Sequence, residues 1–88
     1  MNKAKQDALF FYAYILQSLK ETDRFYTGFS EDPFARLQDH NQGRDPHTAK
    51  HRPWRIKTYF AFSERQNALE FERYLKTASG RAFAKKRL

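Results

Sequence analysis

The chain has 88 residues, of which 40% are apolar and 17% aromatic, with no cysteine and a net charge of +7. A chain of this length supports one hydrophobic core, so we expect a single domain over residues 1–88. Without cysteine there is no disulfide, no thiolate zinc site and no cysteine nucleophile, which fits a reducing cytoplasm. The positive charge favours a polyanionic partner, either nucleic acid or an anionic membrane surface.

Two basic zones lie on the chain, and their distribution favours nucleic acid. No stretch approaches the roughly 20 apolar residues of a membrane span, and the start of the chain lacks the cleavage site of a signal peptide. We therefore expect a cytoplasmic protein without a membrane segment. The basic residues are Arg44, Lys50, Arg52, Arg55 and Lys57 in the first zone, and Arg81, Lys85, Lys86 and Arg87 in the second.

The first predicted elements are two strands joined as a hairpin. Residues 1–8 are mostly polar and we expect them to be frayed. Residues 9–18 ("LFFYAYILQS") are apolar on both faces, which is typical of a central strand. The polar turn "LKETD" leads to a second strand at residues 24–29 ("RFYTGF"), and a hairpin is the shortest connection between the two. Tyr14 and Tyr26 would then stand on neighbouring strands.

A helix is predicted next, from Pro33 to about Asn41. Asp32 can cap its first turn, and proline is favoured at the first helical position because its missing N–H would have no partner there. Residues 42–53 show no periodicity and contain glycine and proline, so they are predicted to form a loop.

A third strand and two more helices complete the prediction. Ser63 and Gln66 form a capping box that opens a helix through Ser79. Gly80 should end or kink this helix, before a short basic helix at residues 81–88. The fold is therefore α/β of the α+β type, a three-stranded antiparallel sheet flanked by helices in the order β-β-α-β-α-α. In the third strand, residues 54–62, we expect Ile56, Thr58, Phe60 and Phe62 on one face and Lys57, Tyr59 and Ala61 on the other.

Glu72 is the most informative single position. On a helix, Ala68, Leu69, Phe71 and Leu75 form an apolar stripe, and Glu72 falls inside it. A carboxylate buried without a partner is strongly destabilising, so Glu72 should meet a cation, hydrogen-bond donors or a metal ion. A structural salt bridge, or a side chain that reaches the edge of the stripe, would also satisfy it.

Other polar residues allow chemistry without requiring it. Tyr14 and Tyr26 could place two phenols side by side, although strand tyrosines commonly serve packing. Arg36 and His40, at i and i+4, share a helix face and could hold a phosphate together, or could form a solvated surface. A histidine zinc site is not expected, because no histidine pair has the spacing of a known zinc motif and no cysteine assists.

These positions together resemble the GIY-YIG nuclease superfamily, from about Phe11 to Gly80. The first motif corresponds to "YAY" at residues 12–14 and the second to "YTG" at residues 26–28. The strand "PWRIKTYFAF" is similar to that of small stand-alone members related to the UvrC N-terminal domain. On this resemblance the family's arginine is Arg36, its histidine is His40, and its metal-binding glutamate, within "ALEFERYLK", is Glu72.

The resemblance implies a metal-dependent endonuclease of DNA repair or recombination that hydrolyses phosphodiester bonds with an activated water. Glu72 would hold Mg²⁺ or Mn²⁺, Arg36 would bind the scissile phosphate, and His40 would assist by hydrogen bonding. Tyr14 would be the base and Tyr26 would orient the water or phosphate, or the two would exchange roles. Because the pKa of a free phenol is near 10, either can act as a base at neutral pH only where cations lower that value.

The two basic zones would grip the DNA backbone on either side of the cut, contacts that position the substrate without reading its sequence. We expect a monomer that binds DNA, either alone or beside a larger repair protein. Two alternatives stay open: a non-catalytic nucleic-acid-binding module with the same fold, and a ribosome-associated or structural basic protein. The residues expected to contact the backbone are Arg44, Lys50, Arg52, Arg55, Lys57, Lys85, Lys86 and Arg87.

Overall fold

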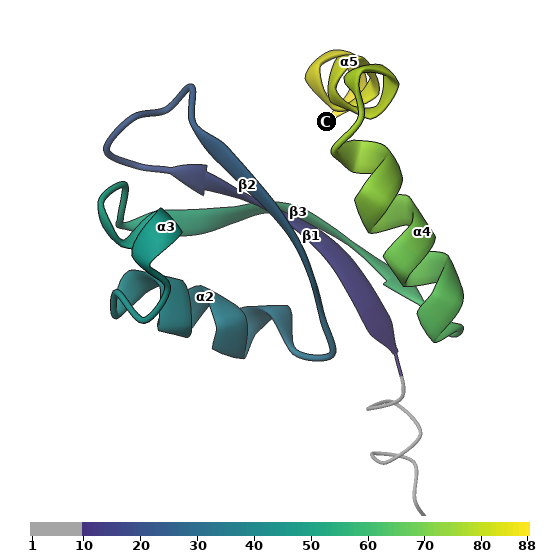
Figure 1. Cartoon of the computed structure of the whole chain (residues 1–88), viewed down its shortest axis with the longest axis horizontal. Coiled ribbons are helices and arrows are strands. Elements are labelled where there is room, and N and C mark those ends of the chain that lie inside the picture. The colour runs from purple at the N-terminus through teal and green to yellow at the C-terminus, as the bar shows by residue number, and fades with distance from the viewer. Residues whose placement is uncertain (1–9) are drawn as a thin grey trace, which may run out of the picture.

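The computed structural model describes residues 10–88, which form one antiparallel sheet with helices on both faces (Figure 1). The expected fraying of residues 1–8 lies outside this part. The strand order β2-β1-β3 confirms the predicted α+β fold and the order of its main elements. The elements are β1 (Phe11–Ser18), β2 (Phe25–Ser30), α2 (Pro33–Asn41), α3 (Pro46–Ala49), β3 (Trp54–Phe62), α4 (Arg65–Leu75) and α5 (Ala78–Arg87).

The central strand β1 divides the core into two clusters, as its apolar faces predict. Ala13 and Ile15 pack with Leu75 and the aromatic side chains of α4 and α5. Tyr14 and Leu16 face the other way and pack with Trp54, Leu37 and Ile56, on the side covered by α2 and α3. Because β1 is hydrogen-bonded on both edges, residues on its α2 face are held in fixed positions.

Helix α2 begins and ends at the predicted residues, and its start is fixed by local chemistry. The Asp32 side chain accepts a hydrogen bond from the Ala35 N–H at 3.1 Å, and Pro33 occupies the first turn. The predicted loop at residues 42–53 is wrong in one respect, because it contains the one-turn helix α3. Asp45 caps α3 by accepting from the His47 N–H at 2.9 Å, and Pro46 follows it in the same way as in α2.

The predicted faces of β3 are wrong at its start, because the strand contains a bulge. Ile15 pairs with Thr58 but Leu16 pairs with Ile56, so Lys57 is an extra residue opposite β1. A bulge of this kind reverses which residues face each side. Ile56 therefore packs on the α2 face, while Phe60 packs against Phe71 of α4 on the opposite face.

The two C-terminal helices meet at a sharper break than predicted. The capping box is wrong: α4 starts at Arg65 after Glu64, which makes no side-chain cap. The break comes at residues 76 and 77 instead of Gly80, where Thr77 caps α5 by accepting from the Gly80 N–H at 3.1 Å. A Cβ on Gly80 would lie 1.8 Å from the Tyr74 carbonyl oxygen, so only glycine permits this close contact between α4 and α5.

Across residues 10–88, no helix combines the length and the apolar character that crossing a bilayer requires.

Candidate active site

Tyr14 lies at the centre of the candidate site, on the α2 face of β1. Its side chain is 1% exposed, and its partner across the strand pair is Gly28 of β2. A Cβ on Gly28 would stand 2.6 Å from the Tyr14 hydroxyl oxygen. The Tyr14 ring therefore crosses directly over Gly28, and its hydroxyl reaches the edge strand β2. The glycine of "YTG" is required for this close approach.

Three other predicted residues gather around this hydroxyl. The ring of Tyr26 lies 6.4 Å from that of Tyr14 and 4.8 Å from the imidazole of His40, measured between centroids. His40 Nε2 is 3.4 Å from the Tyr14 hydroxyl oxygen. Arg36, one turn earlier on α2, is close enough to Tyr14 to affect its pKa. The hairpin and α2 thus bring two phenols, a guanidinium and an imidazole together.

His40 is fully buried and has a second partner that the sequence did not indicate. Its Nδ1 lies 2.7 Å from the hydroxyl oxygen of Thr48 on α3, which is itself 2% exposed. The Thr48 hydroxyl also lies 3.3 Å from the Asp45 carbonyl oxygen, to which it can donate. Thr48 lies in a segment that the sequence predicts as a loop, so the sequence alone gave no reason to place it beside His40.

Arg36 keeps a permanent positive charge beside the phenols. Burial lowers its pKa, but Tyr14 and the carboxylate of Asp39 raise it by more, so the net shift is upward. Its Nη1 contacts Asp39 Oδ2 at 3.3 Å, and the side chain is 42% exposed. A charged group with this much exposure can still turn toward an incoming phosphate.

The pKa of Tyr14 is raised above its usual value of 10. Burial is the largest cause and the neighbouring Tyr26 phenol adds to it, while Arg36 acts in the opposite direction without prevailing. Arg36 therefore acts in the direction expected of a cation, but it does not bring the pKa of this phenol below its usual value. Tyr14 is protonated at neutral pH in the free protein, and it needs a proton acceptor to act as a base.

His40 is neutral at neutral pH. Burial lowers its pKa below 6.5 and the Arg36 charge lowers it further, while Asp45 and Asp39 oppose the shift. A neutral imidazole has one lone pair free to accept a proton. His40 is therefore a chemically suitable acceptor for the Tyr14 hydroxyl proton.

Glu72 lies within the apolar stripe of α4, as predicted, with its side chain 13% exposed. Its Oε2 pairs with the ammonium group of Lys76 one turn later. Helix α4 covers the Ala13 and Ile15 face of the sheet, opposite to Tyr14, and within residues 10–88 no hydrogen bond or ion pair joins Glu72 to the tyrosine cluster. The structure thus gathers four of the five predicted catalytic residues and leaves Glu72 on a separate element.

The edge strand β2 connects these two sides. Lys76, the partner of Glu72, lines a hollow of about 930 Å³ that also includes Tyr26 and Thr27 of β2. Arg65, at the start of α4, lies over the ring of Phe29 in the same strand, 5.3 Å from its centroid. Tyr26 lines both this hollow and a smaller pocket between β2 and α3, so one residue of the edge strand borders hollows on both sides of the sheet.

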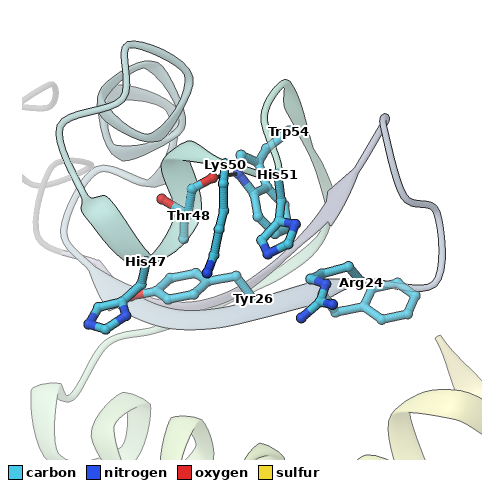
Figure 2. Close-up of a pocket in the computed structure, with 8 residues that line it drawn as sticks. Arg24, Tyr26, His47, Thr48, Lys50, His51 and Trp54 are labelled. Atoms are coloured by element: carbon cyan, nitrogen blue, oxygen red, sulfur yellow. Dashed lines mark hydrogen bonds between the residues drawn. The ribbon is translucent and has the colours of Figure 1, made fainter.

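The predicted nucleic-acid contacts fall on both faces of the sheet. Lys50 lines a pocket of about 250 Å³ between β2 and α3, and Figure 2 shows Lys50 and His47 reaching toward Tyr26. Arg24 and His51 line the same pocket and are basic residues that were not predicted as contacts. On the other face, Lys57 and Lys85 line the hollow beside α5, where the bulge has turned Lys57 toward the Leu88 carbonyl oxygen.

The remaining predicted basic residues are at the surface, and some have protein partners. Arg44 faces Asp39 at 3.8 Å, and Arg55 donates two hydrogen bonds to the Gln17 side chain at 3.0 and 2.7 Å. The guanidinium of Arg52 lies close over Gly43. Lys86 and Arg87 are exposed in the last turn of α5. Of the predicted contacts, Lys50, Lys57 and Lys85 thus line hollows bordered by β2, and the others lie elsewhere on the surface.

The comparison with protein families gives one match over nearly the whole described chain. Residues 10–87 match the model of the GIY-YIG catalytic domain. The chain belongs to the GIY-YIG family. Two fungal proteins are similar to it: the structure-specific endonuclease subunit SLX1 of Kluyveromyces lactis, 33% identical over 78 residues, and subunit slx1 of Talaromyces marneffei, 36% identical over 69 residues.

These relatives are much longer than this GIY-YIG domain. The matched regions cover 81% and 72% of this chain, but only 27% of the K. lactis protein and 18% of the T. marneffei protein. The chain therefore spans about a quarter or less of the relatives it matches, and their similarity bears on the GIY-YIG domain alone.

The pKa of His40 predicts a pH dependence of stability. The unfolded chain binds a proton at His40 below about pH 6.5, whereas the folded GIY-YIG domain does not until a lower pH. Stability should therefore fall as the pH drops through about 6.5 toward the folded pKa of His40. His40→Gln removes this contribution, so its free energy of unfolding should decrease less than that of wild type between about pH 8 and pH 5.

Urea denaturation at a series of pH values measures both curves. The difference between the two proteins at about pH 8, where His40 is neutral in both states, serves as the reference. Parallel curves from pH 8 to 5 would show that His40 is not held neutral by the fold.

Proposed function

We propose that this chain is a metal-dependent endonuclease domain that hydrolyses phosphodiester bonds in DNA. The observation that carries the proposal is the meeting of Tyr14, Tyr26, Arg36 and His40 on the α2 face of a GIY-YIG domain. Because the similar fungal proteins are named subunits of structure-specific endonucleases, we propose branched or flapped DNA as substrate and a role in repair or recombination beside a partner protein. One copy of the chain holds these four residues together with Glu72, so we propose that a monomer is sufficient.

The Glu72 carboxylate is a suitable protein ligand for one hard divalent cation. Within residues 10–88 there is no cluster of three or more acidic or histidine ligands, so a cage made of protein groups alone is not formed there. Mg²⁺ keeps several of its waters and can be held by one carboxylate together with substrate oxygens. Glu72 has one oxygen paired with Lys76, which is 53% exposed and can move aside. Glu72 would hold Mg²⁺ or Mn²⁺, and the ion would stabilise negative charge on the leaving oxygen.

The other residues have roles that follow from their surroundings. Arg36 binds the scissile phosphate, because its charge is permanent and its side chain is half-exposed. The water oxygen bonds to phosphorus as the bond to the leaving oxygen breaks. Tyr14 takes the proton of this water while its own hydroxyl proton passes to His40 Nε2. Tyr26, which contacts both rings, orients the water or the phosphate.

The pocket between β2 and α3 is suited to a neighbouring backbone phosphate. Lys50 and His47 reach toward Tyr26 in this pocket (Figure 2), and neither makes an ion pair within residues 10–88. Glu21 pairs with Arg24 and His51, whereas no acidic partner of Lys50 is found within residues 10–88. The second basic hollow, beside α5, provides Lys57 and Lys85 on the far side of β2. DNA could contact both while a phosphate lies at the edge strand.

Substitution of Glu72 and Tyr14 tests the chemistry. On flapped DNA with Mg²⁺ or Mn²⁺, Glu72→Gln and Tyr14→Phe should each lower the cleavage rate by about 10²-fold or more, since each removes a group used in the transition state. DNA binding should stay near the wild-type level. Gel assays of cleavage and of binding on the same substrate measure the two effects.

Glu70→Gln is the matched control, because Glu70 is exposed on the same helix and bonds only Gln66. It should cleave like wild type, and chelation of the metal should stop cleavage. Binding without any metal-dependent cleavage would instead favour the non-catalytic module, and cleavage that survives in both active-site variants would indicate a contaminating nuclease.

The salt dependence of binding tests the role of Lys50. If Lys50 neutralises one backbone phosphate, Lys50→Ala should reduce the log-log slope of affinity against salt by about 0.9 on duplex DNA. Arg73→Ala is the control, because Arg73 is exposed on α4 away from the pocket and its loss should leave the slope almost unchanged. Fluorescence anisotropy over a range of salt concentrations gives both slopes, and equal slopes for the two variants would contradict the assignment.

A further inference from the structure

We propose that Thr48 is a positioning residue that fixes the His40 imidazole in the tautomer protonated at Nδ1, with Nε2 free to accept the Tyr14 proton. The proposal rests on the function proposed above, and it adds a residue and a specific task to that site. It depends on three groups that form one buried chain: the hydroxyl of Tyr14, the imidazole of His40 and the hydroxyl of Thr48.

His40 has one contact with Tyr14 and one with Thr48, and the contact with Thr48 is the shorter of the two. His40 Nδ1 lies 2.7 Å from Thr48 Oγ1, and both side chains are almost completely buried. Thr48 can donate its own proton to the Asp45 carbonyl oxygen at 3.3 Å. Its oxygen is then available to accept the N–H of His40 Nδ1. In a neutral imidazole, a proton on Nδ1 leaves the lone pair on Nε2.

The surroundings of Tyr14 favour the same tautomer. The Tyr14 hydroxyl is buried between His40 Nε2, at 3.4 Å, and the guanidinium of Arg36. A guanidinium can only donate hydrogen bonds, so it cannot take the Tyr14 proton. If Nε2 carried the histidine proton, His40 and Arg36 would both present donors to this hydroxyl. With Nε2 unprotonated, the Tyr14 hydroxyl can donate to His40 and keeps its lone pairs for the nearby guanidinium of Arg36.

The fold holds Thr48 in place through a closed set of contacts. The indole Nε1 of Trp54 donates to the Thr48 carbonyl oxygen at 2.9 Å. The backbone of Trp54 in turn makes two hydrogen bonds with the side chain of Asn41, at 2.6 and 3.0 Å. Asn41 follows His40 directly in the sequence, so α2, α3 and the start of β3 are connected around the imidazole. The one-turn helix α3 thus holds Thr48 beside His40.

This arrangement matters for the reaction because Tyr14 is protonated in the free protein. A phenol with a raised pKa can take a proton from water only if its own proton leaves at the same time. The acceptor must present a lone pair, in the correct direction, toward the phenol. By holding the proton of His40 on the side of α3, Thr48 keeps this lone pair directed at Tyr14.

Two substitutions at Thr48 distinguish the role of its hydroxyl from the role of its side-chain shape in packing. Thr48→Val keeps the shape of the side chain and removes the hydroxyl, whereas Thr48→Ser keeps the hydroxyl. The ¹⁵N chemical shifts of the His40 ring report its tautomer without any substrate. We expect the Nδ1–H form in wild type and Thr48→Ser, and a mixture or the Nε2–H form in Thr48→Val.

Cleavage kinetics give a second readout. Thr48→Val should lower kcat by about 10- to 100-fold with little change in KM, because an orienting group is lost and DNA contacts are kept. Thr48→Ser should restore most of kcat. An Nε2–H tautomer in wild type, or an unchanged tautomer in folded Thr48→Val, would overturn the proposal. A changed tautomer with an unchanged kcat would support the positioning by Thr48 and show instead that His40 is not the proton acceptor.

Discussion

The close approach of the Tyr14 ring to Gly28 is the constraint on which the site depends. Because Gly28 has no side chain, the ring can cross from the central strand and deliver its hydroxyl to the edge strand. There it meets His40 and Arg36 from α2 and the ring of Tyr26. The four side chains thus meet beside an open edge of the sheet, and Tyr26 among them lines hollows that border this edge.

The candidate site is divided between the two faces of the sheet, which meet at the edge strand β2. The phenols, the guanidinium and the imidazole come from the face covered by α2, while Glu72 comes from α4 on the other. β1 is enclosed between β2 and β3, so on the proposed function groups from the two faces would meet around an edge of the sheet, and β2 is the edge strand that carries Tyr26. The basic residues follow the same division, with Lys50 on one side of β2 and Lys85 on the other.

The sequence predicted those parts that depend on local chemistry. The cap at Asp32, the apolar faces of β1 and the position of Glu72 within the apolar stripe of α4 follow from spacing and residue type, and they were confirmed. The helix break at residues 76 and 77 is local, but the cap at Thr77 was overlooked in favour of Gly80. The bulge at Lys57 depends on the pairing of β3 with the distant strand β1, so the local alternation gave a wrong strand face. Thr48 was missed for the same reason, since only the tertiary fold brings α3 against His40.

The most direct test of this account asks whether a metal bound at Glu72 lies beside β2. Mn²⁺ broadens the amide NMR signals of nearby residues, and it can be added to the chain without DNA. The account predicts broadening on α4 around Glu72 together with Tyr26, Thr27 and Gly28 of β2, and its loss in Glu72→Gln. Broadening that is confined to α4, or that persists in Glu72→Gln, would contradict the claim that the acid and the phenols serve one phosphate.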